Sequence, residues 1–124
     1  MAKTFFIFGC VFSFLGVALG AFGAHALKQK LSPELLQVFE VGVRYQMYHA
    51  FALFVVAWTL QSWNITSAAA SGWWFIAGIV LFSGSLYAFA LTDIKWFGAV
   101  APVGGLSFLL GWLWLAWSVW KGIQ

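Results

Sequence analysis

The stretch TFFIFGCVFSFLGVALGAFGAHAL (residues 4–27) decides the fold, because it runs for 24 positions without a charged residue. A helix rises about 1.5 Å per residue, so roughly 20 apolar residues cross a hydrocarbon core about 30 Å thick. Two further uncharged runs cover residues 45–92 and 96–120. The first and last runs each fit one span, and the 48-residue middle run fits two spans joined by a turn. The sequence therefore predicts four transmembrane helices.

The overall composition excludes a water-soluble protein. The 124 residues are 64% hydrophobic and 7% charged, whereas globular proteins carry roughly 25% charged residues. The basic residues lie at the edges of the predicted spans, where lipid phosphates are nearer partners than nucleic acid. The single cysteine, Cys10, lies within the first span and has no partner for an intrachain disulfide.

We expect an all-α membrane protein with a single domain over residues 1–124. Its spans are predicted at about 5–26, 45–61, 72–92 and 102–120, with an amphipathic elbow helix at the membrane interface over about 33–44. Ser32 followed by Pro33 is typical of a helix start, and Gly42 is the expected bend. Pro102 either opens the fourth helix or interrupts a longer one. Gly16, Gly20 and Ala24 form a small-residue stripe, which indicates close packing of the first span on another helix of the bundle or on a second copy.

The two membrane faces of this topology differ in charge. Both termini and the 62–71 loop share one face, which carries Lys3 and Lys121. The opposite face carries four basic residues, so the positive-inside rule favours placing it in the cytoplasm. These four are also the candidate ligands for lipid headgroups: Lys28, Lys30, Arg44 and Lys95. Eight of the nine tryptophans lie in the half of the membrane nearest the termini, where indole rings anchor at the headgroup boundary.

Polar residues are expected to gather at the charged face. His25 ends the first predicted span, His49 begins the second and Asp93 ends the third. Glu40 precedes Arg44 by four residues, the favourable order for a helical ion pair. The full set of candidate residues on this face is His25, Glu40, Arg44, Tyr45, His49, Tyr87 and Asp93.

Four interpretations of this set stay open. The histidines can satisfy hydrogen-bond partners where helices meet, or the basic residues can bind lipid headgroups. His25, His49 and Asp93 can instead relay a proton or small solute. A metal or haem between the two histidines is the fourth interpretation, although a metal site needs three or four ligands. We expect no metal, no cofactor and no enzyme activity, because the chain has no recognisable catalytic motif.

Four segments carry a resemblance to a known family: GAFGAHAL (20–27), FEVGVRYQMYHAFAL (39–53), LFSGSLYAFALT (81–92) and APVGGLSFLLGW (101–112). In this order they resemble the YgdD/YwdK-like family of small bacterial inner-membrane proteins, which is similar to eukaryotic transmembrane protein 256. The resemblance covers nearly the whole chain. It implies a four-helix membrane protein whose family has no assigned biochemical function, and it implies no catalytic or binding residue.

The function predicted from the sequence is that of a non-enzymatic accessory or scaffold protein of the inner membrane, with several spans. Its expected partners are membrane lipids, and also a second copy of the chain or another membrane protein. The alternative function is a small oligomeric transporter or channel that uses the polar face of histidine and aspartate residues.

Overall fold

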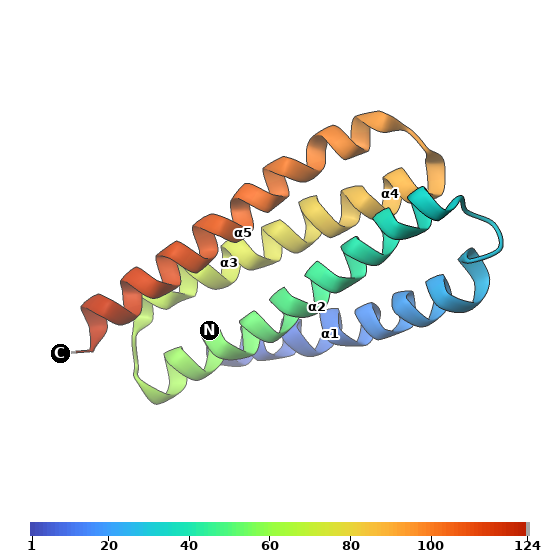
Figure 1. Ribbon diagram of the computed structural model, residues 1–124. Coiled ribbons are helices and arrows are strands. Elements are labelled where there is room, and N and C mark those ends of the chain that lie inside the picture. Colours follow the sequence, from blue (N-terminus) through green and yellow to red (C-terminus); the bar gives the residue numbers. More distant parts are fainter. Residues whose placement is uncertain (124) are drawn as a thin grey trace.

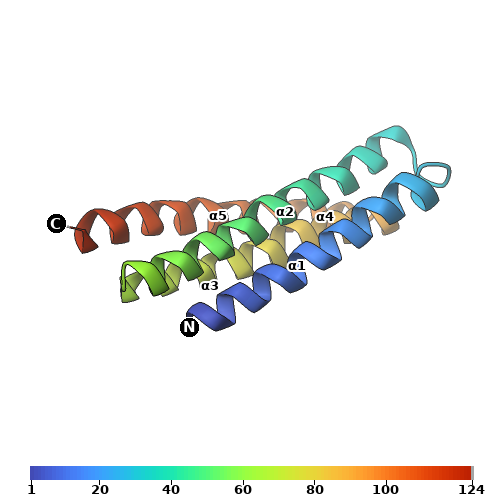
Figure 2. The same ribbon diagram turned by 90° about the horizontal axis from the view of Figure 1, so that it is seen from below.

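The computed structural model describes residues 1–123, which form helices and turns without a strand. Four long helical segments run antiparallel to their chain neighbours (Figure 1). The turns at residues 28–32 and 93–94 lie at one end, called here the loop end. Both chain ends and the turn at 63–65 lie at the other, called here the termini end (Figure 2). The predicted all-helical class is confirmed.

The first segment consists of α1 (Ala2–Phe22), which continues as the π-helical η1 (Gly23–Leu27). The second is α2 (Pro33–Ser62). The third consists of four consecutive pieces: η2 (Thr66–Ala68), α3 (Ala69–Gly78), the π-helical η3 (Ile79–Ser83) and α4 (Gly84–Thr92). The fourth is α5 (Lys95–Gly122).

Three of the four segments are long and apolar enough to cross a membrane: Ala2–Leu27, Thr66–Thr92 and Lys95–Gly122. The second segment, α2, carries Glu34, Glu40 and Arg44 in its first half. Because of these charges, α2 is less apolar than the other three segments, although it is about as long as they are.

The α2 helix begins where the sequence predicts but does not divide. The hydroxyl of Ser32 accepts a hydrogen bond from the Leu35 N–H at 3.2 Å, and Pro33 occupies the first turn. Residues 33–44 then continue into one helix that ends at Ser62, so the separate elbow helix is not confirmed. The reason is packing: Phe39 is 1% exposed and belongs to a buried cluster with Leu27. The apolar stripe thus faces the bundle rather than a membrane surface.

Gly42 is a point of close contact within the continuous helix α2. A Cβ atom added there would lie 2.8 Å from the Tyr87 ring. The Gly42 carbonyl also accepts a hydrogen bond from the Ser83 hydroxyl at 2.7 Å. The glycine therefore allows α2 to approach the third segment closely.

The fourth segment is a longer helix that continues through Pro102. It begins at Lys95, after Asp93 closes the preceding helix in the left-handed conformation, with a φ of 56°. Pro102 has no N–H to donate to the Gly98 carbonyl. Packing on both sides of this gap holds the helix together: Gly98 lies against the Phe89 ring, and Gly104 lies against the backbone of Phe82.

Small residues of α1 set a constant antiparallel register with α2. Gly9 lies against Phe54, Gly16 against Met47 and Gly20 against Val43. The predicted packing within the bundle is therefore confirmed for Gly16 and Gly20, whereas Ala24, the third residue of the predicted stripe, is exposed in η1.

Candidate functional site

Five of the predicted candidates lie at the loop end of the bundle. His25 is an exposed residue of η1, and Lys28 and Lys30 are exposed in the turn that follows. Asp93 and Lys95 are exposed in and after the turn between α4 and α5. The Thr92 hydroxyl shapes that turn, because it donates to the Ala88 carbonyl at 2.6 Å and accepts from the Ile94 N–H at 3.2 Å.

Glu40 and Arg44 are exposed one turn apart on α2. Arg44 follows Val43, which lies beside Gly20 of α1. Arg44 is therefore at about the level of Gly20 along the bundle. Seven helical residues separate Gly20 from Leu27 at the loop end, so Arg44 lies about 10 Å inside that end. A side chain as long as arginine can reach the headgroups from this depth. The ion pair between Glu40 and Arg44 stays a prediction.

The structure does not bring His25 and His49 together. His25 lies two residues after Gly23, which packs against Phe39 of α2. Ten helical residues separate Phe39 from His49, a rise of about 15 Å. The expected common face fails because α2 begins at Pro33 within the bundle, which makes His49 its 17th residue of 30. His49 therefore lies near the middle of the helix.

The imidazole of His49 is held at both nitrogens and by a stacked ring. Its Nδ1 lies 2.8 Å from the Tyr45 carbonyl oxygen, and the Trp112 indole N–H donates to its Nε2 at 3.0 Å. The ring stacks on Phe108, with centroids 3.5 Å apart and an interplanar angle of 9°. Only 4% of His49 is exposed.

These partners assign the tautomer of His49. A carbonyl oxygen only accepts, so Nδ1 carries the proton; an indole N–H only donates, so Nε2 offers its lone pair. Both nitrogens of the neutral ring are thus engaged. A metal, a haem iron or a relayed proton would have to displace Trp112 to reach Nε2. Within residues 1–123, no group of three or more His, Cys, Asp or Glu residues could hold a metal ion.

Tyr87 belongs to a second polar cluster that joins three helices. Its hydroxyl donates to Gln46 Oε1 at 2.6 Å, and Gln46 Nε2 donates to the Phe12 carbonyl of α1 at 2.8 Å. Gln46 is 3% exposed. Because a buried amide is costly unless it is hydrogen-bonded, this cluster fixes α1, α2 and α4 relative to one another.

Gln46 and Trp112 were not among the predicted candidates. Gln46 stands within the uncharged run, and a polar side chain in a predicted span is expected to face protein rather than lipid. A polar side chain within a predicted span is therefore the sequence signal that could have identified Gln46 as a buried contact residue. Nothing in the sequence distinguishes Trp112 from the other eight tryptophans, because its role depends on the register between α2 and α5.

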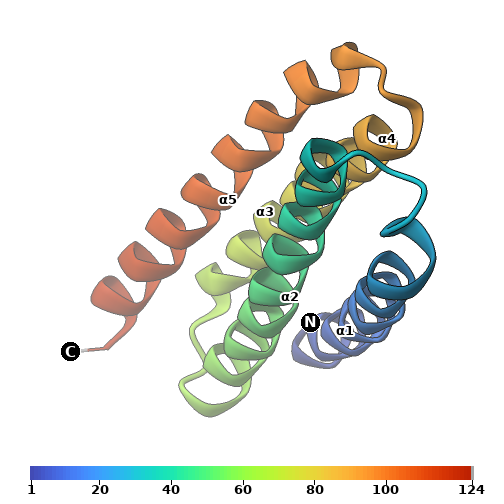
Figure 3. The same ribbon diagram turned by 45° about the vertical axis from the view of Figure 1, so that its right-hand side comes forward.

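A groove of about 440 Å³ runs beside His49, between α2 and α5. Figure 3 shows that α5 runs beside α3 and α4, apart from the first half of α2. Aromatic and aliphatic side chains line the groove together with one glycine and the edge of His49: Tyr45, Tyr48, His49, Phe82, Gly105, Phe108, Leu109 and Trp112. The volume falls in the range of small-molecule sites.

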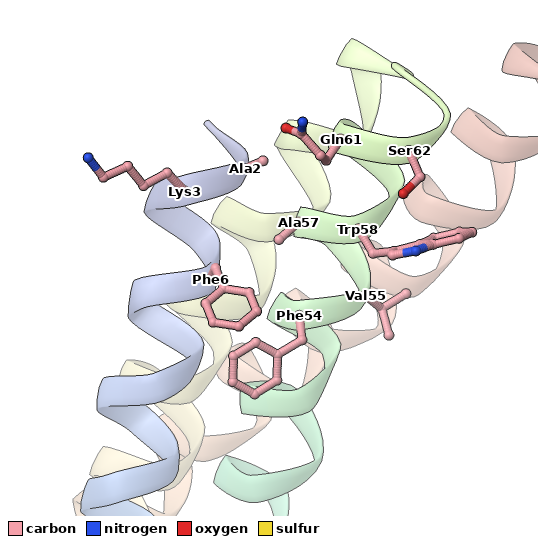
Figure 4. A pocket seen from close by; sticks show the side chains of 9 residues that line it. All are labelled: Ala2, Lys3, Phe6, Phe54, Val55, Ala57, Trp58, Gln61 and Ser62. Carbon is pink, nitrogen blue, oxygen red and sulfur yellow. The ribbon is translucent and has the colours of Figure 1, made fainter.

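A second groove of about 670 Å³ lies between α1 and α2 near the termini end. Phe6 and Phe54 form its inner wall, with ring centroids 4.8 Å apart (Figure 4). Gln61 and Ser62 stand at its outer end, and the Lys3 side chain extends away from it (Figure 4). This mostly apolar lining is one that a lipid acyl chain can fill.

Comparisons with known proteins agree with this membrane architecture. Residues 19–105 match the family described as "Protein of unknown function (DUF423)". The chain is 48% identical over 112 residues to the UPF0382 membrane protein YwdK of Bacillus subtilis (strain 168), which covers 90% of this chain and 91% of the relative. It is 43% identical over 119 residues to a UPF0382 membrane protein of Staphylococcus haemolyticus (strain JCSC1435), covering 96% and 97%.

No solved structure matches the chain. The relatives are named as membrane proteins, and three of the helical segments have the length and composition of membrane spans. The predicted resemblance to the YwdK-like proteins is confirmed. The chain is a membrane protein and belongs to the DUF423 family, together with the UPF0382 membrane proteins.

Proposed function

We propose that this protein is a non-enzymatic accessory protein of the inner membrane, which crosses the bilayer four times and holds anionic lipid headgroups at its loop end. The observation that carries the proposal is the set of exposed basic side chains at or near that end: Lys28, Lys30, Arg44 and Lys95.

The packing of α2 supports its role as the fourth span. Its polar residues Gln46, His49 and Thr59 are buried against neighbouring helices, each at most 4% exposed. Its outward residues are apolar, with Phe51 53% and Val55 47% exposed. Since α2 lies alongside α1 in a constant register, a membrane that α1 crosses also surrounds α2. Lipid-facing polar groups would be costly, and this arrangement avoids them over residues 49–60 of the helix.

The charge distribution supports an orientation with the loop end in the cytoplasm. Four basic residues lie at or near that end, against Lys3 and Lys121 at the other. Positive charge near span ends is retained on the cytoplasmic side. At the termini end, Trp63, Trp117 and Trp120 are between 45% and 82% exposed, as expected for indoles at the opposite headgroup layer.

The headgroup role follows from the position of the basic residues. The two turns at the loop end hold or adjoin Lys28, Lys30 and Lys95, at the expected level of the lipid headgroups. The Arg44 side chain can extend to the same level from its deeper position on α2. Each basic residue near an anionic surface contributes about 1 kcal/mol of attraction. The net positive charge of this end is reduced by three acidic residues, Glu34, Glu40 and Asp93. Lipid binding therefore depends on individual lysines close to a headgroup rather than on the overall charge of the loop end.

Native mass spectrometry of the full chain tests this proposal. The protein is released from nanodiscs of phosphatidylethanolamine and phosphatidylglycerol, and the retained lipids are identified. We expect the wild type to retain phosphatidylglycerol, and the combined Lys28→Gln, Lys30→Gln and Lys95→Gln variant to lose most of it. Lys121→Gln is the matched control at the other end. Equal retention by both variants contradicts the proposal.

The transporter alternative has less support. It requires His25, His49 and Asp93 to act together, yet His49 lies about 15 Å deeper than the level of Gly23, and His25 lies beyond Gly23 toward the loop end. Its nitrogens are also both engaged. Flux through proteoliposomes that is lost in His49→Ala, while the bundle stays folded, would favour the alternative.

A further inference from the structure

We propose that the groove between α2 and α5 binds the ring of a lipid-soluble quinone. The groove is a different surface from the loop-end lysines, and its place in the membrane rests on the proposed crossing of the bilayer by α2. Its depth in the bundle, its tyrosine hydroxyls and its aromatic lining point to this ligand.

The groove lies where the midpoints of two helices meet. Tyr48 is the 16th of the 30 residues of α2, and Phe108 is the 14th of the 28 residues of α5. The stack of His49 on Phe108 places these levels side by side. In a bilayer centred on the bundle, the groove opens into hydrocarbon rather than into the headgroup layer.

Tyr45 and Tyr48 line the groove, and neither hydroxyl has an acceptor among the described residues 1–123. Tyr45 is 38% and Tyr48 54% exposed. None of the side-chain hydrogen bonds among residues 1–123 uses either hydroxyl, whereas the Tyr87 hydroxyl is bonded to Gln46. An O–H group in hydrocarbon without an acceptor is costly, because no water is present to replace the lost bond.

The required acceptor must come from a molecule that enters this depth. Acyl chains carry no acceptor, and ester carbonyls lie near the headgroups. His49 is not the donor or acceptor for the ligand, since its two nitrogens are already bonded to Tyr45 and Trp112. A quinone meets the requirement because its carbonyl oxygens accept hydrogen bonds and its isoprenoid tail keeps it in hydrocarbon.

The walls of the groove suit a flat ring. Phe82, Phe108 and Trp112 are among the residues that line the groove, and Gly105 has no side chain to occupy the space beside Phe82. The volume of about 440 Å³ exceeds that of a single substituted ring and leaves room for the start of the tail.

The test uses the full chain in phosphatidylcholine nanodiscs, with ubiquinone carrying two isoprene units as the probe. Saturable quenching of tryptophan fluorescence measures binding, because Trp112 lines the groove. We expect Tyr45→Phe with Tyr48→Phe to weaken binding by about fivefold for each lost hydroxyl. The combined lysine variant of the loop end should bind the probe as the wild type does.

Gly105→Leu is the variant that fills the groove without breaking the fold. A Cβ atom at Gly105 lies 3.8 Å from the Phe82 ring, which is ordinary contact, and the rest of the leucine side chain enters the groove. We expect binding to weaken more than about tenfold. Gly84→Leu is the matched control, since a Cβ atom there meets nothing within 4 Å, and it should bind the probe normally.

Three outcomes overturn the proposal. The first is quenching by the wild type that does not saturate, and the second is unchanged binding in Gly105→Leu. The third is a dimer in native mass spectrometry that Gly105→Leu separates, because the groove would then hold a second copy of the chain.

Discussion

The indole N–H of Trp112 on α5 donates to Nε2 of His49 on α2 across 3.0 Å. This bond joins two helices that otherwise make few contacts along the groove, and it fixes the imidazole as a neutral acceptor. A histidine near the middle of a membrane bundle therefore acts first as a joint between helices.

Removing this bond should destabilise the bundle. Trp112→Phe keeps an aromatic ring but leaves Nε2 of His49 without a donor, at a cost of about 1–3 kcal/mol. Trp117→Phe is the control, because Trp117 is similarly exposed at 47% against 43% for Trp112. Unfolding in mixed micelles, followed by circular dichroism, measures both. Equal stability of the two variants contradicts the assigned role of the bond.

The cluster around Gln46 should behave as one unit. Gln46→Leu leaves the Tyr87 hydroxyl without an acceptor and should cost about 1–3 kcal/mol. Adding Tyr87→Phe removes the stranded hydroxyl, so the double variant should be more stable than the sum of the two single changes predicts. A double-mutant cycle on the unfolding free energies measures this coupling, and strict additivity contradicts it.

The close approach of α5 to the third segment depends on Gly104. A Cβ atom there meets the backbone of Phe82, which cannot move as a side-chain end can. Gly104→Ala should therefore destabilise the protein by about 1–3 kcal/mol. Gly84→Ala serves as the control, because its Cβ atom enters open space. Thermal unfolding in detergent separates the two, and a stable Gly104→Ala variant means that the helices are farther apart.

Much of the fold follows from the sequence by simple physical rules. The uncharged runs identify the apolar helices because a hydrocarbon core sets their length. Ser32 and Pro33 mark the start of α2 because local hydrogen bonding and a fixed φ decide it. Gly16 and Gly20 indicate a close helix contact because only small residues permit one.

The features that the sequence does not predict depend on which faces meet. The charged residues within 33–44 are compatible with a separate helix on the membrane surface. Because Phe39 is buried in the bundle, residues 33–44 instead form the first part of α2. Placing the second span at residue 45 then puts His49 at a membrane face, whereas the register with α1 puts it near mid-depth. The partner of His49, Trp112, is 63 residues away in the chain, and no local pattern reports such a contact.

If α2 crosses the membrane, the two ends of the bundle lie on opposite sides of it. Single cysteines at Lys30→Cys, Ile94→Cys and Trp63→Cys, in a Cys10→Ala background, are labelled from either side of intact vesicles with an impermeant maleimide. Positions 30 and 94 should react from one side and position 63 from the other. Labelling of positions 30 and 63 from the same side would contradict a membrane-spanning α2.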